Sequence, residues 1–191
     1  MKYLILLLLI TVLFNSCDFL KNDISPKTET FGNLEGKLNG EVLAKLFPLK
    51  YQVVRANIEP SNKCKDPIGI SVSLYSSKNL YSLRGSLRWD NVKTIPGKFT
   101  VNNNLDICNP NNEVRASFNS LIGGDVSDRS YHVLDTPDNF FELESYNEET
   151  KEIRGKFNVT LVIKPGSGST DSFFSDTLRF TEGRIHTRIF N

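Results

Sequence analysis

The chain of 191 residues is poor in the side chains on which many active sites and metal centres depend. It contains two histidines, three cysteines, one tryptophan and one methionine. It has no Gly-x-Ser-x-Gly pattern, which marks the nucleophile in many hydrolases. A Ser-His-Asp triad needs a histidine base, and neither His132 nor His186 stands in a motif that supplies the other members. We therefore expect ordinary strand histidines and a protein that is not an enzyme.

A strong charge of either sign is also lacking. Lys and Arg number 23 against 22 Asp and Glu, for a net charge of +1, whereas nucleic-acid-binding domains are typically basic. The acidic pairs at 125–128 and 135–138 have too few oxygen ligands for a calcium loop. Gly166-x-Gly168 lacks the helix start that would hold a phosphate. The sequence predicts no nucleic-acid partner, no metal and no cofactor.

An apolar run does occupy the amino terminus. After Met1-Lys2, residues 3–14 are almost wholly apolar (YLILLLLITVLF), and Asn-Ser-Cys follows at 15–17. A membrane-spanning helix needs about 20 apolar residues, so this run is too short. A positive start, a short apolar core and a small residue at the cut describe an export signal. We predict a signal peptide at 1–16.

The residues at the cut favour a lipoprotein signal. The ordinary signal peptidase prefers small side chains one and three residues before the cut, but Phe14 is bulky. Leu-Phe-Asn-Ser-Cys resembles a lipobox, in which Cys17 carries the lipid. Two or more acyl chains, such as palmitate, anchor a protein stably. The alternative is an incidental cysteine behind a plain signal peptide. We expect a membrane partner through the lipid and a cell-envelope location, with the outer membrane favoured although Asp18 retains some lipoproteins in the inner membrane.

The two other cysteines lie in polar, turn-rich stretches. Because exported proteins meet an oxidising compartment, Cys64 and Cys108 predict a disulfide. Closing a loop of about 45 residues stabilises a fold by about 4 kcal/mol in the chain-entropy model. Free thiols, or a zinc site with His132 and His186, are the alternatives, but neither histidine has metal-ligand spacing from a cysteine.

The remaining sequence indicates strands rather than helices. Residues 17–30 are polar and predict a lipid-anchored tether, and 31–191 predict a single domain. Apolar and polar residues alternate there, most clearly at 68–75, 83–89 and 157–163, and Asn39-Gly40 predicts a tight hairpin. Weaker strands are expected at 50–58, 97–102 and 139–146, and a short helical turn near 42–47 or 119–124. The fold class is all-β: an antiparallel sandwich or flattened barrel of about 8–11 strands after the signal helix.

The carboxyl-terminal third carries a resemblance. Residues 144–157 contain Thr-Lys before Ile153-Arg154-Gly155-Lys156-Phe157, and Thr181-Glu182-Gly183-Arg184-Ile185 follows. Leu38-Asn39-Gly40 and Ile95-Pro96-Gly97-Lys98-Phe99 continue the pattern. The chain resembles a family of small Gram-negative lipoproteins of unknown function. The resemblance implies an exported β-domain and transfers no catalytic residue.

Three local features suggest contacts. Phe173 and Phe174 stand in a long polar loop at 165–176, where they either meet a partner or cap the core. Asp176-Thr177-Leu178 matches a short O-glycosylation pattern, with Thr177 as the acceptor. Basic residues occur at polar strand positions, where we expect interspersed acidic residues to leave a face of mixed charge; they are Arg84, Arg88, Arg154, Lys156, Arg179, Arg184, His186 and Arg188.

These features predict a lipid-anchored envelope protein with a non-catalytic binding or structural domain. An envelope protein or a glycan is the expected partner. The alternative is a lipocalin-like carrier of a small apolar ligand, which requires an internal cavity of roughly 300 Å³ or more.

Overall fold

The computed structural model describes residues 30–58, 68–75, 83–103, 113–122, 126–168 and 172–190. These residues form one sheet of eleven strands with a single turn of α-helix and a 3-10 turn. In chain order the elements are β1 (Asn33–Leu38), β2 (Glu41–Val42), α2 (Leu43–Leu46), η2 (Leu49–Tyr51), β3 (Gln52–Ile58), β4 (Ile68–Tyr75), β5 (Leu83–Val92), β6 (Gly97–Asn102), β7 (Glu113–Ile122), β8 (Val126–Val133), β9 (Phe140–Tyr146), β10 (Glu152–Ile163) and β11 (Thr177–Arg188). The predicted all-β class is confirmed.

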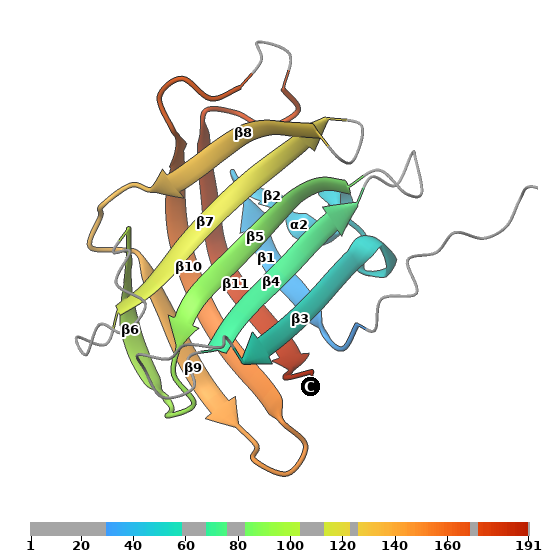
Figure 1. Cartoon of the computed structure of the whole chain (residues 1–191), viewed down its shortest axis with the longest axis vertical. Coiled ribbons are helices and arrows are strands. Elements are labelled where there is room, and N and C mark those ends of the chain that lie inside the picture. The colour runs from blue at the N-terminus through green and yellow to red at the C-terminus, as the bar shows by residue number, and fades with distance from the viewer. Residues whose placement is uncertain are drawn as a thin grey trace, which may run out of the picture.

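The sheet folds over into two layers (Figure 1). One layer contains β3, β4, β5 and β7, and the other contains β1, β11 and β10. Strand β8 pairs with both β7 and β10, while β6 pairs with β7 and β9, so these strands join the layers along one side. The named strands pair antiparallel except β6 and β7, which run parallel. The structure is a flattened barrel.

The opposite side of the barrel is closed by a seam along β3. Ala56 forms a parallel bridge with Ile189, just after β11, and its carbonyl accepts a hydrogen bond from Phe190 N–H at 2.9 Å. Farther along, the Thr30 hydroxyl accepts from Val54 N–H at 3.1 Å. Side chains and single residues therefore replace a continuous ladder here, and they satisfy backbone groups that an open edge would leave exposed.

Aromatic side chains fill the interior between the layers. The ring of Trp89 lies 4.6 Å from that of Phe157 and 5.9 Å from that of Phe141. Phe118 contacts Tyr131 with ring centroids 5.6 Å apart. All five side chains are buried, and such aromatic pairs add about 0.5–1.5 kcal/mol each beyond their buried area.

The hairpin, the weaker strands and the helical turn expected from the sequence can be compared with the structure. Asn39 and Gly40 have φ values of 51° and 88° in the turn between β1 and β2, which confirms the predicted hairpin. The weaker strand predictions correspond to β3, β6 and β9. A helical turn is present at Leu43–Leu46, but the alternative near 119–124 is wrong because 113–122 form β7, held between β5 and β8.

Candidate functional site

A single extra residue in β11 bends the sheet of β1, β11 and β10. Between the pairs Phe157–Gly183 and Val159–Phe180, β11 contributes one residue more than β10, and β1 shows a register shift at the same level. The extra residue brings Glu182 into the left-handed region, with φ of 54°. A bulge of this kind bends a strand and redirects its side chains.

Contacts from both neighbouring strands fix this bulge. The N–H of Glu182 donates to Oδ1 of Asn158 on β10 at 3.0 Å. The carboxylate of Glu182 pairs with Nζ of Lys37 on β1 at 2.5 Å. Gly36, with φ of 127°, lies opposite Gly183 so closely that a Cβ on Gly36 would come within 2.9 Å of the Gly183 Cα. Glycine is therefore required where β1 crosses the bulge.

A groove of about 710 Å³ lies on the outer face of this bent sheet. Its floor is polar and contains Glu35, Lys37, Lys156, Asn158, Glu182 and Arg184. One wall is formed by exposed apolar residues of the segment that follows β1, namely Val42, Ala44 and Leu49. Phe140 of β9 lines it as well.

A second groove of about 550 Å³ adjoins the first. Phe140 and Asn158 line both of them, so they form one continuous concave face. The second groove is walled by the segment 134–139 and floored by Thr160, Arg179 and Thr181. We call the two together the bulge groove. An aromatic ring, an amide and several charges converge in it, which is the composition of a site for a polar ligand.

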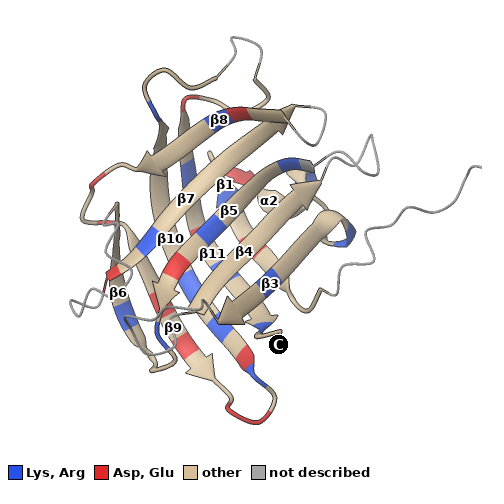
Figure 2. Ribbon diagram, in the orientation of Figure 1, with Lys and Arg blue, Asp and Glu red and all other residues tan. Residues whose placement is uncertain are grey.

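Cations outnumber carboxylates in the bulge groove. Its lining contains five cations, Lys37, Lys98, Lys156, Arg179 and Arg184, against three carboxylates, Glu35, Asp138 and Glu182. Lys98 lies over the ring of Phe140 at 4.3 Å, and Lys156 pairs with Glu144. Arg84 and Arg88 belong to β5 in the other layer (Figure 2), so the basic residues noted in the sequence are divided between two faces.

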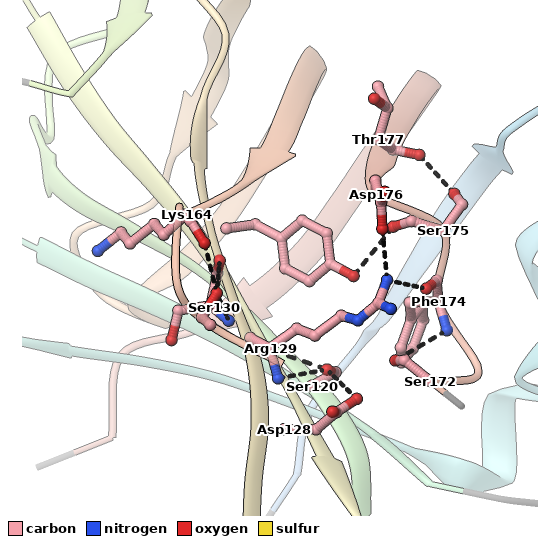
Figure 3. Close-up of polar contacts among 12 residues, drawn as sticks. Ser120, Asp128, Arg129, Ser130, Lys164, Ser172, Phe174, Ser175, Asp176 and Thr177 are labelled. Carbon is pink, nitrogen blue, oxygen red and sulfur yellow. Dashed lines mark hydrogen bonds and ion pairs between the residues drawn. The ribbon is translucent and has the colours of Figure 1, made fainter. Parts of the chain in front are cut away.

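A polar network around the buried Arg129 holds the loop before β11 at one end of the barrel (Figure 3). The Arg129 guanidinium donates to the Phe174 carbonyl at 3.0 Å and pairs with Asp176 at 2.7 Å. The Tyr131 hydroxyl donates to the Ser175 carbonyl at 2.9 Å. Burial raises the pKa of the Tyr131 phenol, and the hydrogen bond and charge of Arg129 oppose that shift.

The two adjacent phenylalanines of this loop have different environments. Phe174 is 4% exposed, and its ring lies 4.9 Å from Phe118 and 6.1 Å from Phe47. Phe173 is 66% exposed, and its ring lies 5.0 Å from that of Phe174 and 6.1 Å from that of Phe47, at the edge of this cluster. Phe174 therefore caps the core. Phe173 faces solvent, although the contacts of Arg129 with Phe174 and Asp176 hold the adjacent part of the loop in place.

Thr177 begins β11 directly after Asp176. Its carbonyl accepts hydrogen bonds from the Ser175 hydroxyl at 2.6 Å and from the Asn39 amide at 3.2 Å. The residue is half-buried, and its glycosylation stays a prediction.

Several predicted residues lie outside the described part of the chain: Cys17, with the signal peptide and most of the tether, and both Cys64 and Cys108. Their lipidation and disulfide stay predictions. His132 and His186 are strand residues, and the His186 Nε2 lies 3.4 Å from the Glu152 carboxylate. Across the described ranges, no group of three or more His, Cys, Asp or Glu is placed to hold a metal, and no helix is long and apolar enough to cross a membrane.

Comparison with known proteins found no matching family model, curated protein or solved structure. The resemblance to the Gram-negative lipoprotein family therefore stays a prediction. Phe140 and Asn158 were not identified from the sequence as site residues, because only the pairing of β9 with β10 brings them together. The sequence does show Gly36 and Gly183, the two glycines at the bulge, but a glycine in a strand indicates a bend without identifying which side chains the bend exposes.

Proposed function

We propose that the protein is a non-catalytic, lipid-anchored binding protein of the cell envelope, and that the bulge groove binds an extended glycan. The observation that carries this proposal is the continuous concave face around Phe140 and Asn158. An aromatic ring can pack against the apolar face of a sugar. The amide of Asn158 can donate to sugar hydroxyls while its Oδ1 remains bonded to Glu182.

The alternative function, a carrier with an apolar ligand inside the barrel, has less support. The two grooves both lie outside the barrel. Between the layers, Trp89, Phe141 and Phe157 are each at most 1% exposed and pack against one another. An internal ligand would have to displace them, at a cost of several kcal/mol for core aromatic groups.

Glycan binding can be tested by NMR on the isotope-labelled mature domain. We would titrate neutral and acidic oligosaccharides and follow the backbone amides. Shifts that cluster on β9, β10 and β11 around Phe140 would support the proposal, and Phe140→Ala should weaken that binding. If no oligosaccharide at millimolar concentration shifts these amides, the proposed function is wrong.

The anchor is tested separately in an exporting Gram-negative host. Full-length protein should be recovered in the membrane fraction, with acyl chains on Cys17 detected by mass spectrometry of the amino-terminal peptide. Cys17→Ser should abolish acylation and leave the signal peptide uncut, because Phe14 disfavours the ordinary peptidase, so the variant should keep residues 1–16 at its amino terminus. A wild-type amino-terminal peptide that carries no acyl chains on Cys17 would contradict lipid anchoring.

The proposed Cys64–Cys108 bridge has its own measurement. Intact mass of the oxidised domain should be about 2 Da below that of the reduced domain, and reduction should lower its stability by up to about 4 kcal/mol. Two free thiols in freshly isolated, unreduced protein would contradict the bridge.

A second surface is favoured by one specific observation. Phe173 is largely exposed although Arg129 and Asp176 fix its loop. A rigidly presented aromatic residue is a common anchor in protein interfaces, because little conformational entropy is lost on binding. We therefore keep Phe173 as the candidate contact for an envelope protein.

A further inference from the structure

The geometry points to an acidic glycan, one that carries carboxylate groups along its chain, as the ligand of the bulge groove. This inference rests on the proposed glycan-binding function and specifies its substrate class. The residues that select the acidic groups are Arg179 and Arg184, on the outer face of β11 on either side of the bulge.

The two arginines are placed to bind separate carboxylates of one glycan chain. Arg179 lines one groove and Arg184 the other, with Thr181 and Glu182 between them on β11. At about 3.3 Å per strand residue, the two positions are roughly 13–16 Å apart. A ligand that reaches both arginines therefore spans several sugar units and crosses the surface shared by the two grooves, which Phe140 and Asn158 form.

Neither guanidinium is committed to a protein partner within the described residues. Arg179 makes contacts there through its backbone, bonded to Asn39, and no ion pair involves either side chain. A guanidinium presents paired N–H donors that match the two oxygens of a carboxylate. Both side chains are exposed and therefore available to a ligand without breaking an internal contact.

Most carboxylates near the groove are already engaged by other residues. Glu182 is paired with Lys37, and Glu144 with Lys156. Glu35 accepts a hydrogen bond from the Asn33 amide at 2.7 Å. Asp138 lies at the far wall of the second groove. Of the lining charges that are not in these ion pairs, the cations Lys98, Arg179 and Arg184 outnumber the carboxylates Glu35 and Asp138, so the remaining charge is positive.

A sugar chain fits this floor better than a nucleic acid. The domain as a whole lacks the basic excess that long contact with phosphates requires. The central positions are an aromatic ring and an amide, with the hydroxyls of Thr160 and Thr181 in the second groove. These groups match the alternating hydroxyl and C–H surfaces of a sugar chain, and no cation lies between Arg179 and Arg184 along β11.

The experiment compares matched ligands by titration calorimetry on the mature domain. The probes are a linear oligogalacturonide, the same oligosaccharide with its carboxylates methyl-esterified, and a single-stranded oligonucleotide of similar length. We expect the acid form to bind at least about tenfold more tightly than the ester. Its affinity should fall as salt is raised from 50 to 300 mM, because exposed charge pairs are screened.

Variants then test which residues cause the preference for the acid form over the ester. Arg179→Gln combined with Arg184→Gln should remove the preference for the acid, so that acid and ester bind with equal affinity, whereas Arg84→Gln, on the opposite layer, should keep the wild-type preference. Equal binding of acid and ester by the wild type would overturn this inference but leave the proposed function standing. Tighter binding of the oligonucleotide would overturn the glycan class, and no binding of any sugar would overturn both proposals.

Discussion

The backbone N–H of Leu34 donates a hydrogen bond to the side-chain Oε1 of Gln52 at 3.0 Å. The side-chain Nε2 of Gln52 in turn donates a hydrogen bond to the Phe47 carbonyl at 2.9 Å. Gln52 is only 4% exposed, so one buried side chain connects β1, β3 and the turn that follows α2. Gln52 therefore links the two sides of the seam through its side chain rather than through a backbone ladder.

Replacing Gln52 by Leu should therefore destabilise the domain by about 2–4 kcal/mol, because the Leu34 N–H and the Phe47 carbonyl would be left buried and unsatisfied. Urea unfolding monitored by tryptophan fluorescence measures the change. Lys50→Ala, at an exposed position of the neighbouring turn, is the control and should alter stability by less than about 0.5 kcal/mol. An equal, small effect of both substitutions would show that the seam does not depend on Gln52.

The bulge makes a prediction through Gly183. A Cβ added there would lie 2.5 Å from a ring carbon of Phe157, and that ring is packed on Trp89. Gly183→Ala should therefore cost about 1–3 kcal/mol by overpacking and should weaken ligand binding by shifting the groove floor.

Gly97→Ala provides the matched control. A Cβ at Gly97 meets only a ring carbon of Phe99, at an ordinary 3.7 Å. This variant should stay within about 1 kcal/mol of the wild type. If the two alanine variants unfold at the same denaturant concentration, the bulge is not packed as described.

The paired phenylalanines give a third test. Phe174→Ala removes a buried ring that contacts Phe47 and Phe118, and should cost about 3–5 kcal/mol. Phe173→Ala removes a ring that is 66% exposed and should cost about 1 kcal/mol or less. Thermal unfolding of both variants distinguishes them, and a large loss in Phe173→Ala would remove the main support for a contact role.

The sequence predicted what alternation and turn chemistry determine. Val72 and Leu74 face the interior and Ser71 and Ser73 face outward, as their spacing requires. The hairpin at Asn39-Gly40 followed from residues that tolerate positive φ. Strand count and fold class were therefore predictable, because each depends on short stretches of chain.

The bulge groove was not predictable from such patterns. The residue in the left-handed region is Glu182, not a glycine, so local propensity does not mark it. Its conformation is imposed by Asn158 and Lys37, which are 24 and 145 residues away along the chain. The burial of Arg129 was missed for the same reason, since its partner Asp176 is 47 residues away.

The last prediction concerns alkaline pH and Tyr131. Burial raises the pKa of this phenol above its ordinary value of 10.0, so the folded protein holds the proton at a pH where the unfolded chain has lost it. The folded state then binds more protons than the unfolded state, and the free energy of unfolding must fall as pH rises above about 10. Guanidinium unfolding at pH 8 to 11 measures this slope. Tyr131→Phe should be less stable at pH 8, because the hydrogen bond to Ser175 is lost, but its stability should fall less steeply above pH 10. Curves that stay parallel up to pH 11 would show that Tyr131 ionises equally in both states and that its site admits water.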